Sequence, residues 1–150
     1  MDRFAIVVGR FNAEVTGGLL AGAREYLAQQ STKVADGDVV YAPGAFEIPL
    51  IAKSLAKTGR YAGVICLGAV IKGETAHFEF ISLGATIGLM QAGLETGVPI
   101  TFGILTAYDD AQAAARSGTG ADAMSNNKGR EAAAACFESV RTLQAIRENK

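Results

Sequence analysis

Short, uniformly apolar runs alternate along the chain with longer segments that have helical periodicity. The first run, residues 4–8, ends at a glycine, a pattern typical of a strand that is buried on both faces. Leu19 and Leu27 then share one helical face and Thr16 is a suitable N-cap, which predicts a helix over residues 17–30. The same order recurs three times before a final helix. These further strands and helices are expected at residues 38–42 and 48–57, 63–69 and 78–96, 100–105 and 109–116, and 127–149.

This alternation predicts an α/β protein. Parallel strands need long crossover connections, and helices in those crossovers cover both faces of the sheet. We therefore expect a three-layer, flavodoxin-like fold, in which a mainly parallel four-stranded sheet lies between two layers of helices. The chain has 150 residues, 49% of them hydrophobic, which is in the ordinary range for a single domain over residues 1–150.

Charge and composition exclude several classes of partner. The net charge is -1, so no long-range field attracts nucleic acid or an anionic membrane surface. Cys66 and Cys136 lie far apart among apolar neighbours, without the spacing of a zinc or redox site, and are expected to be reduced core residues. The first apolar run is too short for a signal peptide, and no run approaches the roughly 20 residues of a membrane span. A cytoplasmic protein is expected.

The candidate chemistry lies in the loops after the strands, where ligands bind in open α/β sheets. Phe11 follows the first strand with no apolar run around it, so it either stacks on a planar ligand or covers its own helix. Glu47 stands near the start of a predicted helix. Its carboxylate either accepts hydrogen bonds from the free backbone amides or binds ligand hydroxyls.

The loop after the third strand contains the only histidine, His77, at the junction with the next helix. Imidazole is the side chain whose ordinary pKa lies nearest neutrality, so acid/base chemistry at pH 7 is assigned to it first, and a structural role is the alternative. Thr75 and the amides that open this helix form a candidate anion site. Arg116 either complements a helix C-terminus or binds phosphate.

Five segments of the chain together resemble the lumazine synthase family in order and spacing. They are Gly-Arg-Phe-Asn at 9–12, Pro-Gly-Ala-Phe-Glu-Ile-Pro at 43–49, Gly-Ala-Val-Ile-Lys-Gly-Glu-Thr-Ala-His-Phe-Glu at 68–79, Val-Pro-Ile-Thr-Phe-Gly-Ile-Leu-Thr at 98–106 and Asn-Lys-Gly-Arg-Glu-Ala-Ala at 127–133. The resemblance implies a transferase of riboflavin biosynthesis. It condenses 5-amino-6-(D-ribitylamino)uracil with 3,4-dihydroxy-2-butanone 4-phosphate to 6,7-dimethyl-8-ribityllumazine, releases phosphate and water, and uses no metal ion or organic cofactor.

The resemblance also implies a role for each motif residue. The pyrimidine and its ribityl chain would contact Phe11, Ala45, Phe46, Glu47, Ala69, Val70 and Ile71, with Phe102 contributed by the adjoining subunit. The ketone phosphate would contact Glu74 and Thr75, with Arg116 and Lys128 from the neighbour. His77 would transfer protons.

Two other functions remain open at this stage. An archaeal-type riboflavin synthase has a similar fold but joins two lumazines, and a flavin- or lumazine-binding protein would keep the pocket without catalysis. The motifs at 43–49 and 68–79 favour the first function.

The resemblance implies a homopentamer with active sites between subunits. Some relatives pack twelve pentamers into a shell by means of a short connection between the last two helices. Here the connection from Arg116 to Lys128 is several residues longer, which predicts a free pentamer.

Overall fold

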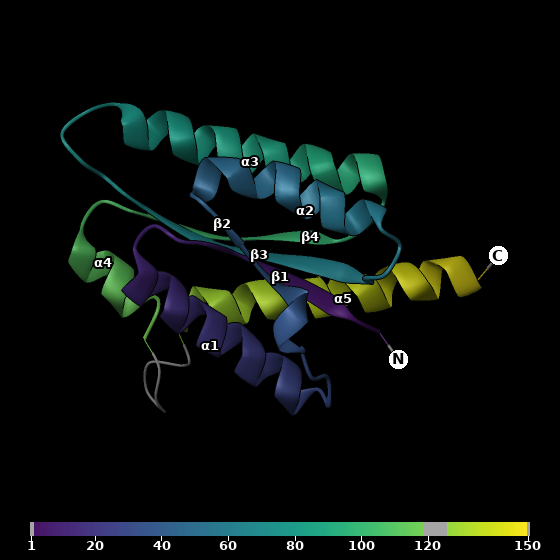
Figure 1. Cartoon of the computed structure of the whole chain (residues 1–150). Helices are drawn as coiled ribbons and strands as arrows, with labels where there is room; N and C mark the ends of the chain where they lie inside the picture. Colours follow the sequence, from purple (N-terminus) through teal and green to yellow (C-terminus); the bar gives the residue numbers. More distant parts are fainter. Residues whose placement is uncertain (1, 119–125, 150) are drawn as a thin grey trace.

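Four parallel strands form one sheet in the order β2-β1-β3-β4 in the computed structural model, which describes residues 2–118 and 126–149 (Figure 1). The strands are β1 (Phe4–Gly9), β2 (Val39–Ala42), β3 (Gly63–Ile71) and β4 (Ile100–Ala107). Each neighbouring pair is parallel. This order belongs to the flavodoxin-like doubly wound fold and confirms the predicted class.

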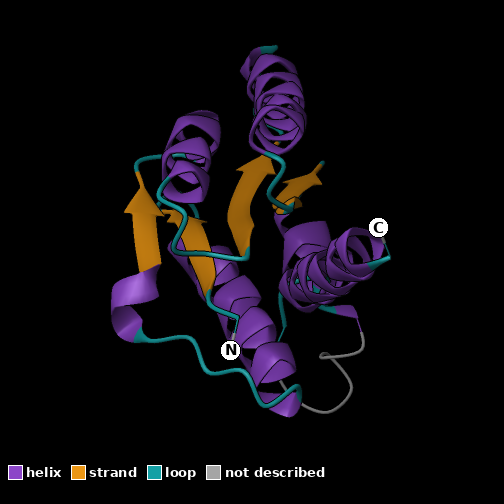
Figure 2. Cartoon of the chain, turned by 90° about the vertical axis from the view of Figure 1, so that its right-hand side faces the viewer, coloured by secondary structure: helices purple, strands orange, loops and turns teal. Residues whose placement is uncertain are grey.

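Helices cover both faces of this sheet. They are α1 (Ala13–Gln29), α2 (Ile48–Lys57), α3 (His77–Thr96), α4 (Asp110–Ala115) and α5 (Lys128–Glu148). One apolar core joins the sheet to α1, α4 and α5, and a second joins it to α2 and α3. Figure 2 shows the strands between the two helical layers. The three-layer prediction is therefore confirmed.

The third and fourth strands each extend two residues further than predicted. Val70 pairs with Thr106 and Ile71 pairs with Ala107, so the ladder continues to the end of β3. β-Branched side chains favour this extended backbone, and they outweigh the polar residues that follow. As a result, the candidate residues Val70 and Ile71 belong to the strand instead of the loop.

Helix α1 begins earlier than the predicted start, and Thr16 is not its cap. Asn12 precedes the helix with φ 59° and ψ 53°, in the left-handed region that asparagine tolerates. Thr16 lies buried inside the first turn, and its N–H donates to the Asn12 carbonyl over 3.0 Å. The helix therefore starts directly after the first site loop.

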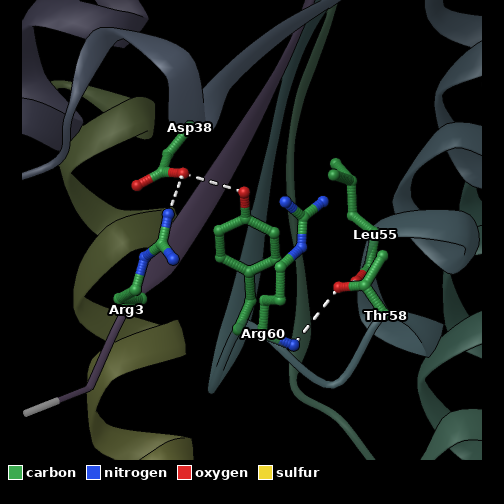
Figure 3. Close-up of polar contacts among 6 residues, drawn as sticks. Arg3, Asp38, Leu55, Thr58 and Arg60 are labelled. Carbon is green, nitrogen blue, oxygen red and sulfur yellow. Dashed lines mark hydrogen bonds and ion pairs between the residues drawn. The ribbon is translucent and has the colours of Figure 1, made fainter.

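A buried carboxylate ties the amino-terminal end of the sheet together. Asp38 closes a 3₁₀ turn (Asp36–Asp38) instead of opening β2 as predicted, because its side chain is engaged elsewhere. Oδ1 of Asp38 accepts from the Arg3 guanidinium over 2.7 Å and from the Tyr61 hydroxyl over 2.8 Å (Figure 3). The guanidinium groups of Arg3 and Arg60 lie over the Tyr61 ring. This cluster lies at the edge opposite the site loops.

Helix α3 exposes most of its large apolar residues, and two of its three buried residues are alanines. Ala85, Leu89 and Ala92 are buried. The exposed side chains recur at alternating spacings of three and four, which places them on one helical face. They are Phe80, Leu83, Ile87, Met90 and Leu94, called here the α3 stripe. The helical periodicity of apolar residues that was expected in the segments between the strands is therefore absent from α3, because this helix is apolar on both faces.

Asn127 joins α1 to the start of α5. It is fully buried, and its amide Nδ2 donates to the carbonyls of Gly18 and Gly118 over 3.0 Å each. Its Oδ1 accepts from the Arg130 N–H over 3.0 Å, which caps α5. A Cβ added at Gly22 would lie 2.3 Å from the same Oδ1, so only glycine leaves room for this amide.

Both cysteines are buried and free, as predicted. Burial raises the pKa of Cys136 to about 12 and raises that of Cys66 well above its ordinary value, so both thiols stay protonated. Among the described residues, no helix combines the length and apolar character needed to cross a bilayer. Most of the connection used to predict a free pentamer, residues 119–125, lies outside the described residues.

Candidate active site

Three site loops meet at the carboxyl edge of the sheet, where β1 lies between β2 and β3. The Arg10 N–H donates to the Ala42 carbonyl over 2.9 Å, and the Asn12 side-chain amide donates to the Ala69 carbonyl over 3.1 Å. A Cβ added at Gly9 would lie 3.7 Å from both Gly44 and Gly68. The strand order reverses direction at β1, so the loops after β1 and β3 flank the crevice in which doubly wound proteins bind ligands.

Phe11 and Glu47 come together against Gly44. A Cβ at Gly44 would lie 3.1 Å from Cδ2 of Phe11 and 3.3 Å from Oε1 of Glu47. The Phe11 ring is 71% exposed, so it does not cover its own helix. Glu47 is the N-cap of α2, yet its exposed carboxylate accepts no capping hydrogen bond. The structural roles considered for both residues are thus not realised, and a flat exposed ring lies beside an acceptor.

The remaining residues predicted to bind the pyrimidine differ in accessibility. Phe46 is exposed, but its ring packs on α3, where a Cβ at Gly84 would lie 2.9 Å from Cε2. The atoms nearest to a Cβ at Gly44 belong to Phe11 and Glu47, and not to Phe46. The side chains of Ala45, Ala69 and Val70 are buried, and Ile71 is half-buried.

His77 is the first residue of α3 and is exposed. Its backbone N–H donates to Oγ1 of Thr75 over 3.3 Å, so the threonine orders the turn that opens the helix. Glu74 and Thr75 are exposed in the loop before it. An imidazole at a helix N-terminus stands beside backbone N–H groups that favour anions, which suits proton transfer next to a bound phosphate.

A second group of predicted residues lies along the free edge of β4. Phe102, Arg116 and Lys128 line a groove of about 440 Å³ together with residues 103–106 and α5. The Lys128 N–H donates to the Arg116 carbonyl over 2.9 Å, which holds the end of α4 against the start of α5. The lining of the groove does not include Phe11, Glu47 or His77.

Both cations in the groove have partners within the chain. Nη1 of Arg116 donates to the Gln112 carbonyl over 3.0 Å, so the residue completes the C-terminus of α4 as the structural alternative predicted. Nζ of Lys128 pairs with Glu131 over 2.8 Å. Each side chain stays half-buried at the surface of the groove.

The position of Phe102 separates the two groups in space. Phe102 pairs in register with Cys66, four residues before Thr106 and its partner Val70. Four residues of a strand span roughly 13 Å, so Phe102 lies well below the carboxyl edge where Phe11 and His77 stand. Its ring is 47% exposed on the outer strand.

Sequence reasoning gave no role to Asn12 although its motif was recognised. Its side chain joins the loops after β1 and β3, and its backbone starts α1. The signal available in the sequence was the residue type, since asparagine tolerates left-handed backbone better than most side chains. Among the described residues, no group of three or more His, Cys, Asp or Glu side chains is arranged to hold a metal ion.

The parallel sheet, the loops at its switch point and the exposed imidazole beside a helix N-terminus define a flavodoxin-like α/β enzyme. A family model for 6,7-dimethyl-8-ribityllumazine synthase matches residues 2–144. The chain belongs to this family.

Relatives match over nearly the whole chain. A protein of Caulobacter vibrioides named 6,7-dimethyl-8-ribityllumazine synthase 1 is 64% identical over 147 residues, which cover 98% of this chain and 94% of the relative. A 6,7-dimethyl-8-ribityllumazine synthase of Salinibacter ruber is 52% identical, over 91% of this chain and 85% of the relative. One of Nitratidesulfovibrio vulgaris is 47% identical, over 96% and 90%.

Proposed function

We propose that this chain condenses 5-amino-6-(D-ribitylamino)uracil with 3,4-dihydroxy-2-butanone 4-phosphate to 6,7-dimethyl-8-ribityllumazine, at sites shared between neighbouring subunits. The observation that supports it best is the proximity of the exposed Phe11 ring to the Glu47 carboxylate, which makes no capping hydrogen bond, at the sheet's switch point. A flat ring beside an acceptor suits a pyrimidine that carries a polyhydroxyl chain. Membership of the synthase family agrees with this chemistry.

The pyrimidine binds over Phe11, and Glu47 accepts hydrogen bonds from the ribityl hydroxyls. The backbone of residues 69–71 lies along the same edge and borders the ring, because β3 runs to the end of that crevice. Ala45 and Phe46 contribute the turn that places Glu47. The ring of Phe46 holds that turn to α3.

The phosphorylated ketone binds at the start of α3, where the loop donors at Glu74 and Thr75 and the backbone amides that open the helix surround its phosphate. The pyrimidine amine adds to the ketone and one water leaves as the imine forms, phosphate is then eliminated, and ring closure releases a second water. Each step moves a proton, and His77 transfers it at this position. Most of the acceleration comes from holding two substrates together, which is worth about 7 to 11 kcal/mol in well-oriented reactions.

The second half of the site comes from the neighbouring subunit. Phe102 lies about four residues below the edge where Phe11 stands and cannot close over that ring within one chain. A neighbour that presents its β4 groove brings Phe102, Arg116 and Lys128 over the open pocket. The guanidinium fork of Arg116 then binds the ketone phosphate from the far side.

The α3 stripe supports self-association as a homopentamer. Contiguous exposed apolar surface of this kind marks an interface with another protein, and the spacing of three and four matches helix-on-helix packing. We propose a free pentamer of about 78 kDa in the cytoplasm, from five chains of 15.5 kDa. Light scattering coupled to size exclusion tests it: a megadalton particle contradicts the free pentamer, and a stable monomer contradicts the shared site.

The enzymatic assay incubates the protein with the diamine and the ketone phosphate and follows lumazine fluorescence. Product formation that needs both substrates is expected. Conversion of lumazine alone to riboflavin would favour the archaeal-type riboflavin synthase instead. Tight binding of lumazine without turnover would favour a binding protein.

Subunit mixing tests whether the site is shared. His77→Ala and Arg116→Ala proteins are unfolded together, reassembled and assayed beside each parent. In random rings, about one quarter of the sites combine an intact His77 with an intact Arg116 from the neighbour, so activity should rise above both parents. Activity equal to the parental mean would show that both residues act within one chain.

A further inference from the structure

The loop that carries the proposed phosphate ligands has few contacts of its own. Residues 72–77 are all exposed, and a Cβ added at Gly73 would meet nothing within 4 Å. Within the loop, the Lys72 N–H donates to the Ala107 carbonyl over 2.9 Å, and Thr75 accepts from the His77 N–H. The first contact fixes the start of the loop, and the second is internal. Contacts with residues outside the loop are therefore the further means by which it can be ordered.

Tyr108 touches both ends of this loop. The Lys72 ammonium lies 5.7 Å from the centre of the Tyr108 ring, at the start of the loop. The Phe78 ring, directly after His77, lies with its centre 6.0 Å from that of Tyr108 at a tilt of 42°. Both distances are those of favourable cation–π and aromatic contacts. The Tyr108 ring therefore contacts both Lys72 and Phe78, the residues at the two ends of the loop.

The backbone of Tyr108 is held in place by hydrogen bonds. Its N–H donates to Oε1 of Gln112 over 2.8 Å. The next residue, Asp109, caps α4 by accepting from the Gln112 N–H over 2.8 Å. The ring is nevertheless 69% exposed, so it does not form part of either apolar core. A surface aromatic with a fixed backbone and contacts to a single loop is suited to positioning that loop.

We propose that Tyr108 is a positioning residue, which holds the 72–78 loop in the conformation that binds the ketone phosphate and aims His77. The inference rests on the proposed function for the identity of the ligand. Tyr108 does not contact substrate in this scheme; it acts through Lys72 and Phe78. Its loss leaves the ligands present but the loop less ordered, so binding must supply the ordering.

Kinetics of Tyr108→Ala test the proposal, with Tyr108→Phe beside it. We expect KM for the ketone phosphate to rise about 5- to 50-fold in the alanine variant, as one cation–π contact and one aromatic pair are lost. The KM for the pyrimidine should stay within about twofold, because Phe11 and Glu47 lie in the segments that follow β1 and β2 and not in this loop. Tyr108→Phe keeps the ring and should restore wild-type values.

Three controls give the alternatives a distinct outcome. Lys72→Met should reproduce part of the defect, and combining it with Tyr108→Ala should add less than the product of the two effects. Arg141→Ala removes a comparable cation from the Phe137 ring on α5 and should leave both KM values unchanged. If KM for the ketone phosphate rises as much in Tyr108→Phe as in Tyr108→Ala, the positioning role of the ring is overturned and the hydroxyl group is responsible. If both KM values rise by the same factor, the substitution loosens the protein as a whole and the positioning role is likewise overturned.

Hydrogen exchange separates this inference from the proposed function, since it needs no substrate. In Tyr108→Ala, the hydrogen-bonded amides of Lys72, His77 and Glu79 at the two ends of the loop should exchange faster than in the wild type, while those of β1 keep their protection. Unchanged exchange in the loop would overturn the inference even if lumazine is formed. Faster exchange in a protein that forms no lumazine would support the positioning role and contradict the activity.

Discussion

Asn127 and Gly22 should show a reversal of sign when they are substituted together. Asn127→Ala removes two hydrogen bonds from Nδ2 and the cap on Arg130. At about 1 kcal/mol for each, the loss of unfolding free energy is roughly 3 kcal/mol. Gly22→Ala places a methyl group 2.3 Å from the Asn127 amide, so in the wild type it should cost about 1–3 kcal/mol through overpacking.

In the Asn127→Ala background the same methyl group no longer meets the Asn127 amide. The three atoms nearest to a Cβ at Gly22 all belong to the Asn127 side chain, so removing that side chain removes the collision. What remains is the preference of a helix interior for alanine over glycine, about 1 kcal/mol. Gly22→Ala should therefore stabilise the variant that it destabilises in the wild type.

Urea unfolding at one fixed protein concentration measures these differences, because the proposed assembly would make stability depend on concentration. Gly17→Ala in the same helix is the matched control. Its Cβ has no neighbour within 4 Å, so it should stabilise both backgrounds by up to about 1 kcal/mol. If Gly22→Ala has the same sign in both backgrounds, the steric account of the α1–α5 junction is wrong.

Three further outcomes are expected. His77→Ala should keep the fold and substrate binding and lower turnover roughly 10- to 1,000-fold, since proximity still operates; wild-type turnover would remove the assignment. Arg116→Ala should weaken binding of the ketone phosphate and not of the pyrimidine, whereas an equal loss for both would contradict a phosphate contact. The hydrogen bond to Asp38, together with burial, raises the pKa of Tyr61, so the wild type should lose stability as the pH rises above about 10. Tyr61→Phe, less stable by about 1.5–3 kcal/mol at neutral pH, should lack this part of the decline, and parallel urea midpoints between pH 8 and 11 would refute the linkage.

The strands and most helices could be predicted because their apolar runs are long and their periods distinct. The ends of the elements could not be predicted. Asn12 starts α1 through its backbone conformation, and Asp38 lies before β2 instead of in it, where its side chain accepts a hydrogen bond from the distant Arg3. The orientation of α3 was also out of reach. A helix that is apolar on both faces carries no periodic signal that says which face meets the sheet.

The resemblance named the candidate residues and divided them between two subunits, but the distance between the two groups within one chain could not be predicted from the motifs. The position of Phe102 depends on strand register, which pairs it with Cys66 instead of with a residue at the carboxyl edge. The direction of the Phe46 ring depends on the space that Gly84 leaves on α3. Both are long-range packing relations that a local pattern does not encode.

Position 12 requires both a left-handed backbone conformation and a side-chain hydrogen-bond donor, and few residue types other than asparagine provide both. Its backbone is left-handed, which favours glycine, asparagine or aspartate, and its amide donates to the Ala69 carbonyl, which excludes glycine and ionised aspartate. In a selection for activity from a library randomised over the exposed loop 10–12, this position would therefore tolerate almost no variation. The loop can be redesigned around new ligands only if Asn12 is kept, because its hydrogen bond fixes the distance between the loop after β1 and the end of β3.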